Sequence, residues 1–230
     1  MNYRFELHHA ILKSEKLDVL QREIEKGINI LQKGGVIAFP TDTVYGLGAD
    51  AFNAVAVERI YQIKNRPKHR QLPLLIADIE QLTVLADPIP EIAQLLARRF
   101  WPGGLTLVLP KKDSMPAYLA PELTIAVRVP DHPICRAIIQ HLGNPIIGTS
   151  ANISDQPAAL TAEEVEQQLG GTIDFLISGG KCPGGKESTV VDVTRESPII
   201  LRQGIIPSGE IDQIYKEYLE ADSEAHCCRR

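Results

Sequence analysis

The feature that most limits how this chain can fold is a regular alternation of short apolar runs with amphipathic stretches of helical length. The run VIAF at 36–39 is typical of a buried strand, and Asn53 can cap a helix that continues to Lys64. Further strands are predicted at 72–77, 105–109, 125–129, 145–150, 175–178, 189–193 and 199–202, and further helices at 16–33, 90–100, 133–142, 161–169 and 208–219. Because some neighbouring strands have no helix between them, we expect an α/β fold with a twisted, open, mixed sheet and flanking helices.

The size and composition fit one soluble domain. The chain has 230 residues, of which 44% are hydrophobic and 23% charged. We expect residues 1–210 to form the domain and residues 211–230 to form the end of the last helix and a polar tail. No apolar run approaches the length of a membrane span, and the N-terminus has no signal-peptide pattern. We therefore expect a cytoplasmic protein without a membrane contact.

The four cysteines predict no metal site. Cys135, Cys182, Cys227 and Cys228 do not have the spacing of a zinc framework or a disulfide scaffold. The last two stand in the polar segment ADSEAHCCRR, for which a disordered tail is the simpler interpretation. No protein-bound metal is expected.

The net charge of the chain does not indicate a nucleic-acid-binding protein. The formal net charge is −5 and only 5% of the residues are aromatic, so any phosphate contact must come from a local cluster. The segment KNRPKHR at 64–70 is such a cluster, in which His69 and Arg70 are expected to be flanking surface residues. The alternative without a binding function is a solvated helix end whose positive charges complement the helix dipole.

Two glycine-rich segments imitate nucleotide-binding motifs. GLGADA at 46–51 matches a dinucleotide fingerprint, but PTDTVY separates it from the preceding strand. GKCPGGKE at 180–187 has Glu187 where a P-loop needs Ser or Thr, and a strand pattern follows it instead of a helix. The second segment is better explained as a turn that presents Ser188 at the start of a strand.

Small hydroxyl groups and cations gather at predicted strand ends, a position where open α/β sheets bind ligands. Each could be an ordinary turn, cap or surface residue. Arg128 is the exception, because it interrupts an apolar strand, where an unpaired cation would be costly. The residues in question are Thr41, Thr43, Arg128, Thr149, Ser150, Asn152 and Arg202. Together they suit an anionic ligand.

The order of these segments carries a resemblance. PTDTVYGLG, K-x-R at Lys64 and Arg66, WPGGLTLVL, TIAVRVPDHP, GTSAN, STVVDV and LRQG follow one another along the chain. Over residues 20–210 the sequence resembles the YrdC-like family of threonylcarbamoyl-AMP synthases. K-x-R followed by S-x-N is the signature of that family.

The resemblance implies a fold and a reaction. The fold is a twisted open α/β sheet around a large, positively charged cavity. L-threonine and bicarbonate give N-carboxy-threonine, whose carboxylate attacks the α-phosphate of ATP. Pyrophosphate leaves, and a separate transferase complex uses the threonylcarbamoyl-AMP to modify tRNA. Mg²⁺ is expected as a cofactor, carried mostly by ATP itself.

The resemblance also implies roles for single residues. It assigns catalysis to Lys64, Arg66, Ser150 and Asn152, ATP binding to Lys64, Lys68, Thr124, Ser150, Ala158 and Arg202, and L-threonine binding to Thr41, Arg128, Gly148 and Ser188. Ala158 departs from relatives that often have serine there, so only a backbone contact with ATP is expected. No protein carboxylate is expected as a general base, because the carbamate is already an anion.

Other functions stay open. One is a double-stranded RNA-binding module, with direct contact to tRNA as a related expectation. The same domain occurs in hydrogenase-maturation proteins, but their acylphosphatase and zinc-finger segments have no counterpart in this sequence. A sister branch of the family keeps the fold with weak or different activity.

Overall fold

The computed structural model describes residues 3–119 and 122–227. Its helices are α1 (Tyr3–Gln32), α2 (Ala54–Ile63), α3 (Leu82–Leu85), α4 (Glu91–Phe100), α5 (Pro133–Leu142), α6 (Ala162–Leu169) and α7 (Ser208–Cys227), with a 3₁₀ turn at Ile79–Gln81. The strands are β1 (Ile37–Phe39), β2 (Gly46–Gly48), β3 (Leu74–Leu75), β4 (Leu105–Pro110), β5 (Thr124–Arg128), β6 (Ile146–Ile147), β7 (Thr149–Ser150), β8 (Phe175–Leu176), β9 (Thr189–Asp192) and β10 (Ile199–Arg202).

These strands form two open, mixed sheets. One has the order β7-β2-β1-β8 and the other the order β10-β9-β4-β5-β3-β6. Both contain parallel and antiparallel pairs, for example β1 parallel to β8 and antiparallel to β2. The open mixed α/β class predicted from the sequence is confirmed, although the strands divide between two sheets instead of forming one.

The division occurs within the stretch 145–150, which the sequence predicts to be a single strand. Ile147 pairs with Leu74 in the six-stranded sheet, whereas Thr149 pairs with Leu47 in the four-stranded sheet. Gly148 lies between them, and a Cβ atom there would stand 2.1 Å from the Cγ of Leu75. The chain therefore passes from one sheet to the other at a residue that has no room for a side chain.

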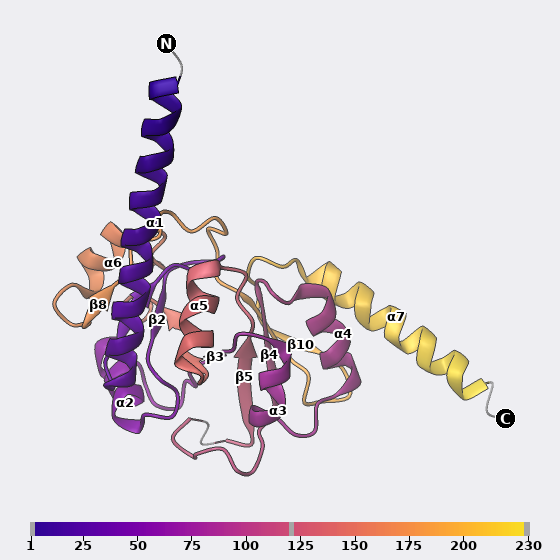
Figure 1. Ribbon diagram of the computed structural model, residues 1–230. Coiled ribbons are helices and arrows are strands. Elements are labelled where there is room, and N and C mark those ends of the chain that lie inside the picture. Colours follow the sequence, from indigo (N-terminus) through magenta and orange to yellow (C-terminus); the bar gives the residue numbers. More distant parts are fainter. Residues whose placement is uncertain (1–2, 120–121, 228–230) are drawn as a thin grey trace.

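Alternation along the strands supplies two hydrophobic cores. Ile37 and Phe39 face α1 and α5, whereas Ala38 between them faces the larger core. Leu75 also lies in the core beneath α1 and α5, whereas its neighbour Leu74 lies in the larger core. The α1–α5 core thus packs against both sheets, and Figure 1 shows these two helices side by side on one flank, with α4 and α7 on the other.

The helix predictions are confirmed in place, with two differences in length. The side chain of Asn53 caps α2 by accepting from the Ala56 N–H at 3.1 Å, and α4 ends at Phe100, directly before Trp101-Pro102. Helix α1 begins well before residue 16, and α7 continues to Cys227, because neither stretch contains an interior proline or glycine that would break a helix. The tail predicted after the last helix is therefore helical to Cys227, while Cys228 lies outside the described residues.

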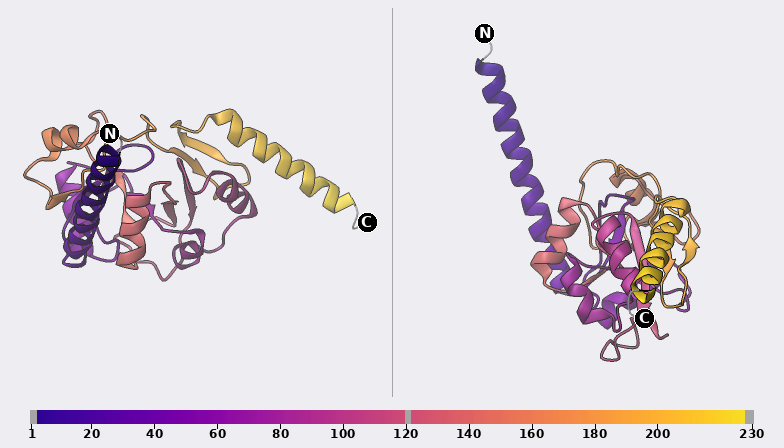
Figure 2. Two further views of the ribbon diagram at one scale, coloured as in Figure 1. Left: turned by 45° about the horizontal axis from the view of Figure 1, so that its top comes forward. Right: turned by 90° about the vertical axis from the view of Figure 1, so that its right-hand side faces the viewer.

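Both long helices extend beyond the body of the molecule, α1 at its N-terminal end and α7 at its C-terminal end (Figure 2). Within the ranges that the structure describes, none of the helices combines the length and the apolar character needed to cross a bilayer.

The structure explains the glycines of the two segments that imitate nucleotide-binding motifs. The glycines of GLGADA lie in β2, where the ring of Phe39 takes the space that a Cβ on Gly46 or Gly48 would need. The segment GKCPGGKE leads directly into β9. Neither segment begins a helix, so neither is a phosphate-binding loop of the motif it imitates.

The crossing at Gly148 can be tested by Gly148→Ala. The added methyl group would collide with Leu75 inside the core, and overpacking of this kind typically costs about 1–3 kcal/mol of unfolding free energy. The matched control is Gly209→Ala, whose new Cβ meets no atom within 4 Å and which lies in α7. Urea unfolding should show a loss of stability for Gly148→Ala and none for Gly209→Ala, so equal midpoints would contradict the crossing.

Candidate functional site

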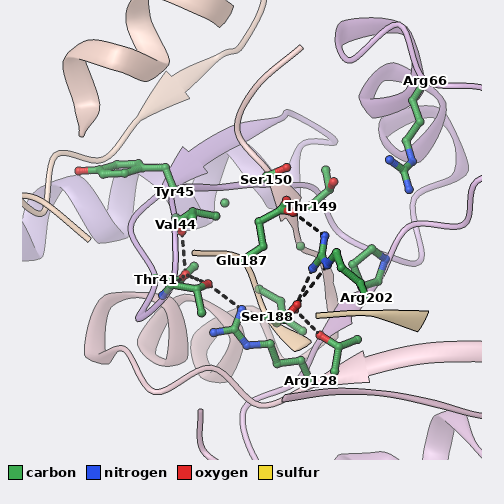
Figure 3. Close-up of a pocket in the computed structure, with 16 residues that line it drawn as sticks. Thr41, Val44, Tyr45, Arg66, Arg128, Thr149, Ser150, Glu187, Ser188 and Arg202 are labelled. Carbon is green, nitrogen blue, oxygen red and sulfur yellow. Dashed lines mark hydrogen bonds and ion pairs between the residues drawn. The ribbon is translucent and has the colours of Figure 1, made fainter. Parts of the chain in front are cut away.

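The candidate site consists of two cavities that share a wall. The smaller has a volume of about 100 Å³ and the larger about 740 Å³. The larger lies within the 300–1,000 Å³ range of small-molecule sites. Both are lined by Val44, Arg66, Ser150, Glu187 and Arg202. Figure 3 shows the smaller cavity and the side chains that surround it.

Most residues predicted from the sequence come together around these cavities. The smaller is lined by Thr41, Arg66, Arg128, Gly148, Ser150, Ser188 and Arg202, and the larger by Lys64, Arg66, Ser150, Asn152, Ala158 and Arg202. Segments from six parts of the sequence thus meet at one place. Arg70, expected on the flanking surface, also lines the larger cavity and pairs with Asp155 at 3.2 Å.

Two predicted residues do not line either cavity. Lys68 pairs with Glu58 at 2.8 Å, and its side chain is 72% exposed. Thr124 begins β5, at the end opposite Arg128. The structure therefore does not bring Lys68 and Thr124 together with the other predicted ATP-binding residues.

Arg128 ends β5 as a buried cation, and each of its three guanidinium nitrogens donates one hydrogen bond to the protein. Its Nη2 pairs with the Asp42 carboxylate at 2.6 Å, Nη1 donates to the Thr43 hydroxyl at 2.9 Å, and Nε donates to the Gly103 carbonyl at 2.8 Å. The partner that a cation in an apolar strand requires is thus Asp42. Of the five guanidinium hydrogens, two remain for a ligand in the smaller cavity.

Several hydroxyl groups also line the smaller cavity. Thr41 donates to the Val44 carbonyl at 2.7 Å, which fixes the turn that follows β1. On the opposite wall Ser188 shares a hydrogen bond with Thr106 at 2.8 Å and accepts one from Arg202 at 3.1 Å. These groups are held by the protein itself, so the cavity has a defined shape before any ligand enters.

Lys64 anchors the S-x-N turn from beneath. It follows α2 and is 1% exposed. Its Nζ donates to the Ser150 carbonyl at 2.5 Å, the Asn152 carbonyl at 2.8 Å and the Asn152 Oδ1 at 3.0 Å. All three ammonium hydrogens are therefore used by the turn. The same Asn152 oxygen accepts from the Ser150 hydroxyl at 2.7 Å.

Burial changes the acidity of this ammonium. Desolvation, helped by repulsion from Arg66 and opposed by Glu187, lowers the pKa of Lys64 from 10.5 to about 8. Protonation of Lys64 is therefore sensitive to pH just above neutrality.

Arg66 is directed toward the cavities by its neighbour. Asn65 adopts a left-handed conformation with φ of 48°, which asparagine tolerates better than most residues. Arg66 then donates from Nε to the Arg70 carbonyl and from Nη2 to the Gln71 carbonyl, both at 3.0 Å. The K-x-R spacing separates a buried anchor, Lys64, from a cation that lines both cavities.

Sequence analysis missed several residues of the site. Asp42 and Glu187 are its important carboxylates, and Thr106 and Lys186 also line a cavity. The sequence does contain a signal for Asp42. It stands between two hydroxyl residues predicted to be in the site, and a cation in an apolar strand, Arg128, requires an acidic partner. The sequence marks Glu187 only as a departure from the P-loop pattern.

Comparison with known proteins agrees with this geometry. Residues 29–204 match the Sua5/YciO/YrdC family model, described as telomere recombination. The chain belongs to this family. Threonylcarbamoyl-AMP synthases from Pyrococcus abyssi and Bacillus subtilis are 45% and 43% identical over 196 and 203 residues, which are 85% and 87% of this chain.

Solved structures of the Sua5/YciO/YrdC family show the same fold. Sua5 from P. abyssi complexed with L-threonine superposes with a TM-score of 0.81 at 45% identity, over 83% of this chain and 56% of that one. E. coli YciO superposes with a TM-score of 0.74 at 32% identity, over 81% and 91% of the two chains. The present chain spans 58% and 59% of the length of the P. abyssi and B. subtilis relatives.

The pKa of Lys64 predicts a stability change with pH. Since its pKa in the folded chain, about 8, is below 10.5, the unfolded chain binds more protons between these values. Unfolding free energy should therefore rise with pH across this window, by up to about 3 kcal/mol. Lys64→Met should lack that rise. Parallel pH profiles of the two proteins in urea unfolding would refute the assignment.

Proposed function

We propose that this chain is an L-threonylcarbamoyladenylate synthase, a nucleotidyltransferase that makes threonylcarbamoyl-AMP and pyrophosphate from L-threonine, bicarbonate and ATP. The observation that carries the proposal is the pair of cavities with a common wall. A small compartment with an anchored arginine suits an amino acid, and a large one with several cations suits a nucleotide. The common wall is where the two substrates would meet.

The smaller cavity supplies an amino-acid site. The two unused guanidinium hydrogens of Arg128 would hold the carboxylate, and lysine could not reproduce that planar geometry. Thr41, Gly148 and Ser188 would surround the rest of the molecule. The P. abyssi relative, at 45% identity, is complexed with L-threonine, which supports an amino acid as the ligand.

The larger cavity supplies the nucleotide site. Arg66, Arg202 and the S-x-N turn would face the phosphates, and Ala158 would offer only backbone. Lys64 would contribute by fixing the turn, and any direct contact with phosphate would require one of its present bonds to be exchanged. Lys68 and Thr124 would have to reach ATP from outside the cavity as it stands.

The reaction fits this division of charge. Arg128 would occupy the carboxylate of threonine, so that carboxylate is not the nucleophile. The carboxylate formed on nitrogen would attack the α-phosphate, and pyrophosphate would leave toward the cations of the larger cavity. Donors that are already in place stabilise the charge that spreads over the phosphate oxygens, and they need no rearrangement during the reaction.

Mg²⁺ fits the larger cavity as a companion of ATP. Across the part of the chain that the structure describes, no three His, Cys, Asp or Glu side chains form a group that could hold a metal. The lining nevertheless includes the carboxylates of Asp155 and Glu187, and Mg²⁺ commonly binds through one or two carboxylates and substrate phosphates. Bound Mg²⁺ would neutralise phosphate charge.

The product would serve tRNA modification in the cytoplasm through a separate threonylcarbamoyl transferase complex. Direct contact with tRNA or double-stranded RNA stays an alternative that no feature of the cavities favours. A sister-branch protein with weak activity would bind the substrates and turn them over poorly.

Pyrophosphate release should require ATP, L-threonine and bicarbonate together. Bicarbonate is the discriminating substrate, because an ordinary amino-acid adenylating enzyme activates the amino acid's own carboxylate. The experiment removes CO₂ from the buffer and then adds labelled bicarbonate. Release that persists without bicarbonate, or an adenylated product without label, would disprove the proposal.

Arg66→Gln should weaken ATP binding or turnover by about ten-fold or more, since a charge-assisted hydrogen bond is worth about 1.5–3 kcal/mol. Lys68→Gln, which removes a nearby cation that lines neither cavity, is the matched control and should change ATP affinity little. Both are measured by calorimetric titration with ATP. The nucleotide assignment fails if the two variants bind ATP equally well.

A further inference from the structure

Glu187 places a negative charge where the two cavities meet. It is the one carboxylate among the described residues that line the smaller cavity, and it lines the larger cavity too. Figure 3 shows its side chain among Ser150, Thr149 and Arg202. A site built for phosphates alone gains nothing from a carboxylate at this position, because like charges repel.

The carboxylate is only partly used by the protein. Its Oε2 pairs with Arg202 Nη1 at 2.8 Å, and its side chain is 34% exposed. For Oε1 the described residues provide no hydrogen bond. The backbone, in contrast, is firmly held, since the Glu187 carbonyl accepts from the Ile205 N–H at 3.0 Å. One carboxylate oxygen is thus available to a ligand from a fixed point of the chain.

Glu187 and Arg128 stand on opposite sides of the smaller cavity. Arg128 ends β5, and Glu187 lies two residues before β9. Strand β4 lies between them, antiparallel to β5 and parallel to β9, so both residues are at the same end of the sheet. The two backbones are two strand spacings apart across the sheet, roughly 10 Å, and they are also offset along it, because Leu107 pairs with Val127 and Leu105 with Thr189. From these positions the long side chains of Arg128 and Glu187 both reach the smaller cavity.

We propose that Glu187 binds the α-ammonium group of the amino-acid substrate while Arg128 binds its carboxylate. The inference rests on the proposed function for the identity of that substrate, L-threonine. It makes Glu187 a residue that selects a zwitterion and sets its direction. The nitrogen, which must receive the new carboxylate, then lies at the wall shared with the nucleotide cavity.

The same charge would help the substrate to move on. Carboxylation by bicarbonate forms the new N–C bond, releases one water and one proton to solvent, and converts the ammonium into a carbamate anion. Glu187 then faces an anion that it repels, whereas Arg66 and Arg202 attract it. The new carboxylate is therefore directed toward the side on which the α-phosphate would lie.

The test compares two ligands and two proteins in a thermodynamic cycle, without ATP or bicarbonate. The ligands are L-threonine and 2,3-dihydroxybutanoate, in which a hydroxyl replaces the ammonium. Glu187→Gln should weaken threonine binding by about ten-fold or more, the effect of one charge-assisted hydrogen bond. It should leave the affinity for 2,3-dihydroxybutanoate nearly unchanged, because that ligand has no positive group.

Glu58→Gln is the matched control, since Glu58 also pairs with a cation but lies outside both cavities. Thermal unfolding of all variants confirms that they are folded. The inference is overturned if Glu187→Gln binds threonine as the wild type does, or if it loses affinity for both ligands equally. Because only binding is measured, a chain that shows this selectivity but forms no labelled adenylate would disprove the proposed reaction and leave the role of Glu187 standing.

Discussion

The arrangement of the site depends on one buried ion pair. Arg128 comes from the six-stranded sheet, and Asp42 and Thr43 come from the turn after β1 in the four-stranded sheet. With the Gly103 carbonyl as a third partner, the guanidinium joins both sheets at the floor of the smaller cavity. Loss of one member of a buried pair commonly costs about 3–5 kcal/mol, because the other charge is left uncompensated. The same bonds that join the sheets orient Arg128 toward a ligand.

Lys64 plays a comparable part beneath the larger cavity. It joins the end of α2 to the turn that contains Ser150 and Asn152. Because the Lys64 ammonium donates all three of its hydrogens to this turn, it holds the turn in one position. The K-x-R and S-x-N motifs, nearly ninety residues apart, are therefore two halves of one structural unit.

Much of this could be predicted from the sequence, and the failures have physical reasons. Periodicity locates strands and helices because apolar residues must face a core, and a cation in an apolar strand marks Arg128. Periodicity gives no information about which sheet a strand joins, so the crossing at Gly148 was missed. Asp42 and Glu187 are not evident from the sequence because each depends on an arginine of another strand, Arg128 and Arg202 respectively. The position of Lys68 outside both cavities is also not visible in the sequence, because its partner Glu58 becomes its neighbour only when α2 and the following turn fold.

The crossing at Gly148 places the walls of the cavities in segments that are far apart along the chain. Residues near 42, 66, 128, 150, 187 and 202 must all be in place before both cavities exist. Contacts of such long sequence separation form slowly, because each closes a large loop. We therefore expect the cavities to form late in folding, so that a ligand that fills them binds only the completed chain. Such a ligand stabilises the whole molecule by mass action, in proportion to the logarithm of its concentration.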